Sequence, residues 1–229
     1  MKFSEPRRLL RMIAAGVFCL VLCQWNYVCL AAAEVNHPEP GSSEREQFLT
    51  KLVAAAIERT AHQERYDGSY RKIPYPGGDV PDDRGVCTDV IIRAYRKAGV
   101  DLQKEVHEDM KVNFSLYPRL WGLTRPDPNI DHRRVANLMV FFKRKGETLP
   151  STRHPADYRP GDLVCWDLGR GITHLGIVVD RKSPDGQRNL IVHNIGAGPR
   201  MEDILFDFPI IGHFRYFGIV SSPGTNPPR

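Results

Sequence analysis

Three side chains of this sequence could together carry out nucleophilic chemistry: Cys87, His174 and His193. Cys87 lies at the expected start of a helix in "DRGVCTDVIIRAYRKAGV", where unpaired N–H groups favour the thiolate, the reactive form of cysteine. His174 opens an expected strand, "THLGIVVD", and histidine can take up and release protons near neutral pH. Either His193 or Asn194, on the next expected strand, could orient the imidazole of His174. Neighbouring strand residues point to opposite faces, so only one of these two can do so.

The first 33 residues have the features of a secretory signal peptide. A basic stretch that ends at Arg11 precedes an apolar run over residues 12–23, and an alanine triplet at residues 31–33 offers a cleavage site. The alternative is an uncleaved membrane anchor, because residues 12–33 could nearly span a bilayer. Cleavage predicts an exported protein of the periplasm or cell envelope, with no stable membrane span.

Removal of that segment would leave two cysteines, Cys87 and Cys165. In an oxidising compartment two cysteines commonly form one disulfide, and such a bridge would remove the nucleophile. The alternative is that Cys165 is a small buried thiol. Alternation along the expected strand "GDLVCWDL" places Leu163, Cys165 and Asp167 on one face, with Val164 and Trp166 on the other.

Charge and composition restrict the partners of the chain. The formal net charge is +5, but the first 33 residues contribute +3 of it, so the remainder is too weakly basic to indicate a nucleic-acid partner. The stretch "VHEDM" contains His107, Glu108 and Asp109, but adjacent helical residues point in different directions and do not converge on a metal ion. We therefore expect no metal, no other cofactor and no nucleic acid.

Periodicity predicts the elements that must position the reactive side chains. Strands are expected after residue 158 in "GDLVCWDL", "THLGIVVD", "NLIVHNIG" and "GHFRYFGIV". Helices followed by strands predict an α+β fold with an antiparallel sheet. The four predicted helices cover residues 44–65, a segment from Cys87 that Gly99 ends, residues 101–113, and a segment that Asp131 caps and Gly146 closes.

The domain organisation follows from the same patterns. Residues 34–43 have the composition of a flexible leader, residues 44–222 form one expected domain, and residues 223–229 form an expected disordered tail. Residues 66–85 are rich in Tyr, Gly, Pro and Asp, which predicts a long irregular loop. Loops of this length within a compact domain are usually functional, and this one leads directly to Cys87.

Two resemblances extend these expectations. The stretch "PGDLVCWDLGRGITHLGIVVD" resembles the strand pair of the NlpC-type cell-wall peptidases, which belong to the papain-like cysteine peptidase superfamily. A closer resemblance, over roughly residues 46–220, is to the family called domain of unknown function 1287. That family name assigns no activity, so the expectation of an enzyme with a papain-like fold comes from the broader likeness. The closer resemblance is seen in "YPGGDVPDDRGVCTDVIIRAYRKAGVDLQKEVHEDM", "NIDHRRVANL", "YRPGDLVCWDLGRGITHLGIVV" and "HNIGAGPRMEDILFDFPIIGHFRY".

The broader resemblance implies a role for each reactive residue. Cys87 would be the nucleophile, His174 the general base, and His193 the residue that orients it. Tyr75 resembles a tyrosine that helps to bind the reacting carbonyl, together with the backbone N–H of Cys87. The sequence departs from the NlpC-type pattern around the cysteine, where Asp usually precedes and Ser-Gly follows, and in the long interval between the two histidines.

Three further residues are candidates for the substrate or oxyanion side of the site: Asp89, Asn194 and Arg133. Arg133 or its neighbour Arg134 could bind a substrate carboxylate through a bidentate contact. The alternative is structural: these arginines would pair with acidic neighbours such as Glu108 or Asp109.

Together these features predict an exported cysteine amidase or peptidase that cleaves an amide bond in peptidoglycan peptides through a thioacyl-enzyme. One alternative is a cell-envelope binding or scaffold module without catalysis. Another is acyl transfer to an acceptor other than water.

Overall fold

The computed structural model describes residues 42–218. The expected signal peptide, nearly all of the expected leader and the expected tail lie outside the described residues. The first helix begins at Ser42, just within the segment expected to be a leader. No helix in the described part of the chain is long and apolar enough to cross a membrane.

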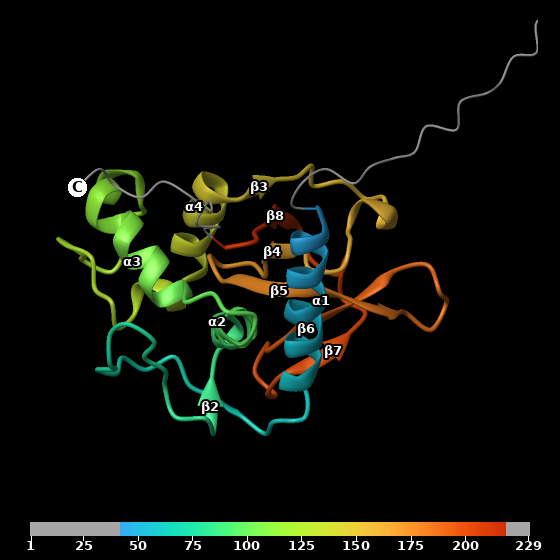
Figure 1. Ribbon diagram of the computed structural model, residues 1–229, viewed down its shortest axis with the longest axis horizontal. Helices are drawn as coiled ribbons and strands as arrows, with labels where there is room; N and C mark the ends of the chain where they lie inside the picture. Colours follow the sequence, from blue (N-terminus) through green and yellow to red (C-terminus); the bar gives the residue numbers. More distant parts are fainter. Residues whose placement is uncertain (1–41, 219–229) are drawn as a thin grey trace, which may run out of the picture. The chain divides into compact units, whose positions relative to one another are not determined.

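The described residues have the predicted α+β architecture, with helices first and an antiparallel sheet after them (Figure 1). The sheet has six strands in the order β3-β8-β4-β5-β6-β7, and every neighbouring pair is antiparallel. The helices are α1 (Ser42–Arg59), α2 (Cys87–Lys97), α3 (Leu102–Asn113) and α4 (Val135–Lys145). The sheet strands are β3 (Glu147–Thr148), β4 (Leu163–Asp167), β5 (Thr173–Lys182), β6 (Asn189–His193), β7 (Arg200–Glu202) and β8 (Ile210–Arg215).

Helix α2 is the central helix of the fold. Its first nine residues, 87–95, are all buried, and it packs against α1 and β5 (Figure 1). At its start the Asp89 carboxylate accepts a hydrogen bond of 2.7 Å from the backbone N–H of Val86, which satisfies a donor that the helix itself cannot. At its end Gly99 adopts a φ of +100°, a conformation that glycine adopts without steric cost.

Alternation along the strands gives the sheet two apolar faces. Leu163 and Cys165 of β4 belong to the core that contains the helices, whereas Val164 and Trp166 belong to a second core on the other face. The predicted division of these β4 residues between two faces is thus confirmed. The sheet is therefore buried on both sides around β4 and β5.

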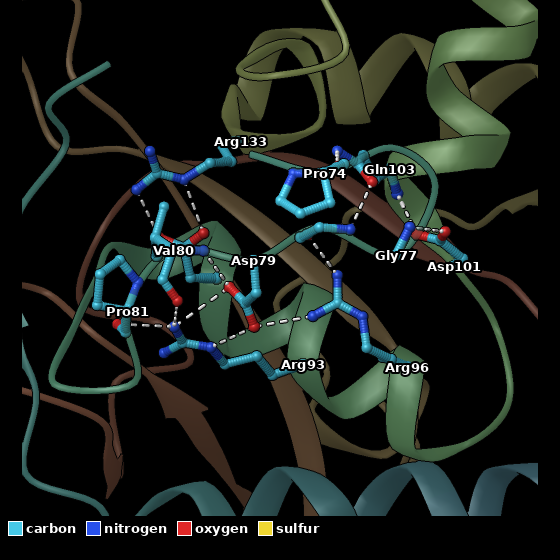
Figure 2. A network of polar contacts seen from close by, with 12 residues as sticks. Pro74, Gly77, Asp79, Val80, Pro81, Arg93, Arg96, Asp101, Gln103 and Arg133 are labelled. Carbon is cyan, nitrogen blue, oxygen red and sulfur yellow. Dashed lines mark hydrogen bonds and ion pairs between the residues drawn. The ribbon is translucent and has the colours of Figure 1, made fainter. Parts of the chain in front are cut away.

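The irregular segment before α2 contributes one short parallel pair, β1 (Arg65–Tyr66) with β2 (Arg84–Gly85). Between these strands, polar contacts hold the segment to α2 and α3 (Figure 2). Arg93 and Arg96 of α2 both bind the Asp79 carboxylate, and Gln103 of α3 accepts a hydrogen bond from the N–H of Gly78. The loop therefore has a defined conformation where it approaches Cys87.

The expected N-cap of α4 is wrong. Asp131 begins a 3₁₀ turn, η2 (Asp131–Arg133), and the residue that precedes α4 is Arg134. The Asp131 carboxylate instead accepts a hydrogen bond from the N–H of Asp127, and its carbonyl accepts one from the Asn137 amide. This 3₁₀ turn lies between Asp131 and the start of α4, so Asp131 is too far from the helix to cap it.

Candidate active site

Cys87 is the first residue of α2 and its side chain is almost fully buried. Burial, with a smaller contribution from the charge of the Asp89 carboxylate, raises the pKa of its thiol to about 11. Backbone N–H groups of Leu175, Thr88 and Cys87 itself interact with the sulfur and oppose this effect. The stabilisation of a thiolate by the helix start is therefore present, but burial outweighs it, and the resting thiol is protonated at neutral pH.

His174 and His193 form a buried pair on β5 and β6. His174 Nε2 lies 3.0 Å from His193 Nδ1, and the two rings are nearly perpendicular. The His174 ring also stacks on Trp166, its partner across β4 and β5. Burial, with a smaller contribution from the positive charge that His193 would carry, lowers the pKa of His174 to about 3. At neutral pH His174 is therefore an uncharged base.

Cys87 approaches β5 at the backbone of Leu175, whose N–H interacts with the sulfur. Leu175 directly follows His174 in the chain. Within residues 42–218, however, no hydrogen bond joins the sulfur to a ring nitrogen of His174, because the His174 ring lies on the Trp166 face of the sheet. Proton transfer between the two residues would therefore need the His174 ring to turn from the Trp166 face toward the sulfur when substrate binds.

Asp89 and Arg133 bind each other, and their side chains are only 2% exposed. Arg133 makes a bidentate contact of 2.8 and 2.9 Å with the Asp89 carboxylate and also donates to the carbonyls of Asp67 and Ser69. Asp89 in turn accepts from the N–H of Val86. The structure thus places both residues in an ion pair that anchors the start of α2, with Asp89 as the partner of Arg133 rather than Glu108 or Asp109.

Tyr75 and Tyr66 occupy different places. Tyr75 packs against His107, with the ring centroids 5.0 Å apart, and no hydrogen bond within the described residues joins it to Cys87. Tyr66 on β1 interacts with the Cys87 thiol; burial, with a smaller contribution from the charge of a Cys87 thiolate, raises the pKa of this phenol to about 12. The spacing of residues gave no sign of Tyr66, since the β1–β2 pairing alone brings it opposite Gly85, two residues before the cysteine.

Asn194 is fully buried beside His193. Its side-chain oxygen accepts a hydrogen bond of 3.0 Å from the N–H of Gly196, while its amide nitrogen has no hydrogen-bond partner among residues 42–218. The residue that contacts the His174 ring is His193, so His193 rather than Asn194 is the one that can orient it.

Glu202, which the sequence patterns did not single out, lies on the far side of His193. Its carboxylate oxygen is 3.0 Å from His193 Nε2. A cavity of about 130 Å³ beside His193 is lined by Glu202, Gly198 and Arg200, among others. It adjoins a wider depression of about 780 Å³ that Arg65 also lines. The histidine pair is thus close to a space that a ligand could enter.

Cys165 is a neighbour of Cys87 within the helix-side core. Both cysteines are free thiols in the structure. Burial raises the pKa of Cys165, and the charge of a Cys87 thiolate would raise it further. Cys165 is therefore an inert buried thiol in this state.

Comparison with known proteins places this site in a family. The family described as "Domain of unknown function (DUF1287)" matches residues 53–216. The chain belongs to the DUF1287 family. All the candidate residues described above, including Tyr66 and Glu202, fall within the DUF1287 match. The chain is also 55% identical over 152 residues to "Uncharacterized protein YijF" of Escherichia coli (strain K12), which covers 66% of this chain and 74% of that protein. The expected membership of this family is confirmed.

Proposed function

We propose that this chain is an exported cysteine amidase or peptidase with a papain-like fold of the NlpC type, which cleaves an amide bond in peptidoglycan peptides. The observation that carries the proposal is the meeting of Cys87, at the start of α2, with the residue that follows His174, whose ring is backed by His193. Export is supported by the signal-peptide features of residues 1–33. The substrate class is supported by the resemblance to exported cell-wall peptidases.

In the proposed reaction Cys87 sulfur attacks the amide carbonyl carbon while its proton passes to His174. The C–N bond then breaks, His174 gives that proton to the leaving amine, and a thioester remains on Cys87. Water, deprotonated by His174, attacks the thioester, releases a carboxylic acid and restores the thiol. The N–H of Cys87 and the hydroxyl of Tyr66 would donate to the developing oxyanion; both interact with the sulfur at rest, which supports this role.

The charges in this mechanism form during the reaction and are not present at rest. Burial disfavours both the thiolate of Cys87 and the imidazolium of His174. Two opposite charges 4 Å apart attract by about 4 kcal/mol at an effective dielectric constant of about 20, which offsets part of the cost of burying them together. We therefore expect proton transfer to accompany attack on a bound substrate.

The second candidate function is a cell-envelope binding or scaffold module without turnover. Two observations favour it: the deep burial of Cys87, and the lack of a direct hydrogen bond to His174 within the described residues. An amine acceptor in place of water would make the same site a transamidase.

The test is cleavage of purified peptidoglycan and its soluble fragments, with products identified by chromatography and mass spectrometry. We expect Cys87→Ala and His174→Ala to lower the rate by at least about 1,000-fold, since such residues act as a unit. Cys165→Ala is the matched control, because Cys165 is a buried thiol in the same core, and it should retain activity. Full activity of Cys87→Ala would refute the proposal. Binding without cleavage by the unmodified protein would favour the scaffold module.

A further inference from the structure

We infer that Glu202 is a positioning residue that fixes the ring tautomers of both buried histidines and leaves His174 Nδ1 free to accept a proton. The contacts that carry this inference form a chain of three side chains from β5, β6 and β7. The tautomers follow from these contacts alone. The catalytic consequence rests on the proposed function.

The first link is the contact between His193 and Glu202. A carboxylate can only accept hydrogen bonds, so the 3.0 Å contact requires a proton on His193 Nε2. A neutral imidazole has one N–H, and His193 Nδ1 must therefore be an acceptor.

The second link is the contact between the two rings. His193 Nδ1 accepts, so the 3.0 Å contact requires a proton on His174 Nε2. His174 Nδ1 then carries a lone pair. No hydrogen bond within residues 42–218 occupies that nitrogen, so it is the atom of His174 that could accept a proton.

Both steps need neutral rings, and the surroundings favour them. Burial lowers the pKa of both histidines; for His193 the charge of Glu202 partly opposes this. The groups that face His193 come from three strands: His174 on β5, Trp166 on β4, and on β7 both Glu202 and the cross-strand partner Arg200. Of these, Glu202 alone has a hydrogen bond to His193 Nε2.

The backbone holds the three side chains in place. Gly176 on β5 leaves room for His193, because a Cβ at residue 176 would lie 3.2 Å from the Cβ of His193. Gly198 begins the turn into β7 at a φ of +86°, and a Cβ there would lie 3.2 Å from the carbonyl oxygen of Glu64. Glu202 is thus presented to His193 by a closely packed turn and strand.

Without a carboxylate at residue 202, the tautomers of His193 and His174 are no longer fixed. His193 could then carry its proton on Nδ1 and donate it to His174 Nε2. His174 would in turn be protonated on Nδ1 and could not accept a proton from the thiol. Glu202→Gln is an informative change, because an amide has nearly the same shape but can donate as well as accept.

The experiment is nitrogen-15 NMR of the full mature protein with labelled histidine, at neutral pH. In the unmodified protein we expect both His174 and His193 to show an N–H at Nε2 and a lone pair at Nδ1. In Glu202→Gln we expect a mixture of tautomers at both rings. Asp203→Asn is the matched control, because Asp203 is the next carboxylate in the chain and binds Arg188 instead, and it should leave both spectra unchanged.

A proton on Nδ1 of His193 in the unmodified protein would overturn the inference, as would unchanged tautomers in Glu202→Gln. This readout needs no activity, so it separates the inference from the proposed function: the expected tautomers without cleavage would uphold the first and reject the second. Where cleavage is measurable, Glu202→Gln should lower kcat at least about tenfold with little change in KM.

Discussion

Two polar regions lie on either side of helix α2, and they differ in whether their titratable groups are charged or neutral. On the loop side, Asp79 binds Arg93 and Arg96 (Figure 2). Asp89 binds Arg133, so these buried or half-buried charges have partners of opposite sign. On the sheet side, Cys87, His174 and His193 are buried as neutral groups, and burial moves their pKa values away from the usual range.

The difference indicates which region is structural and which could be chemical. Paired charges satisfy one another and hold the loop and the helix start in place. The three neutral groups keep protons that they can exchange, and one of them, His193, lines a cavity. Titratable groups with shifted pKa values are common in functional sites. The presence of buried polar groups therefore does not by itself identify the candidate site. The distinguishing property is that its titratable groups are neutral rather than paired as ions.

The largest effect should come from breaking the paired region. Asp89→Ala leaves the Arg133 guanidinium buried without its carboxylate, and we expect it to lower the free energy of unfolding by about 3–5 kcal/mol. Urea unfolding measures this loss. The control is Asp180→Ala, which breaks an exposed pair with Arg181 and should cost about 1 kcal/mol or less. Equal effects of the two changes would contradict the structural role of Asp89.

Acid should destabilise the fold through its buried neutral histidines. Burial and the charge of Arg133 lower the pKa of His132 to about 3, and His174 is shifted to a similar value. Between about pH 6.5 and 3 the unfolded chain therefore binds more protons than the native state, and stability falls as the pH falls, by about 1.4 kcal/mol per pH unit for each histidine. Above about pH 6.5 neither histidine makes the free energy of unfolding depend on pH.

His132→Gln tests this directly. Urea unfolding between pH 4 and 8 should show a shallower loss of stability in acid, by about 1.4 kcal/mol per pH unit, than in the unmodified protein. The difference between the two proteins should stay constant above pH 7, which is the internal control. Parallel curves in acid would show that His132 is not buried as a neutral ring.

A smaller effect should come from crowding the histidine pair. A Cβ at Gly176 would lie 2.6 Å from Ile191 Cγ2 and 3.2 Å from the His193 Cβ, so Gly176→Ala must displace a strand. We expect a loss of about 1–3 kcal/mol in unfolding free energy and a change in the nitrogen-15 resonances of His193. Gly68→Ala is the control, since its Cβ would make an ordinary 3.5 Å contact with Val86 and should have little effect. Unaltered His193 resonances in Gly176→Ala would contradict the packing described.

Local signals predicted much of the fold. Gly99, Asp101 and Gly146 lie next to helix ends as expected, because glycine and aspartate act on the few residues beside them. The four long strands followed from alternation. Strands β3 and β7 were not predicted, because two or three residues carry no periodic pattern and only pairing with a neighbouring strand defines them.

The site was less predictable than the fold. The sequence placed Cys87, His174 and His193 on the right elements, since each lies at the end of a helix or strand. It favoured Tyr75 over Tyr66 and did not find Glu202. These two depend on strand pairing between distant segments, which local spacing does not encode.

The sequence by itself determined the α+β order of elements, the two faces of β4 and the family. Each of these follows from local propensity, from periodicity or from matched residues. The tertiary structure alone decided that Arg133 binds Asp89, that Tyr66 faces the thiol, and that Glu202 ends the chain of histidines. It also decided that the reactive groups rest uncharged, because burial, which sets the balance between charged and neutral forms, exists only once the chain has folded.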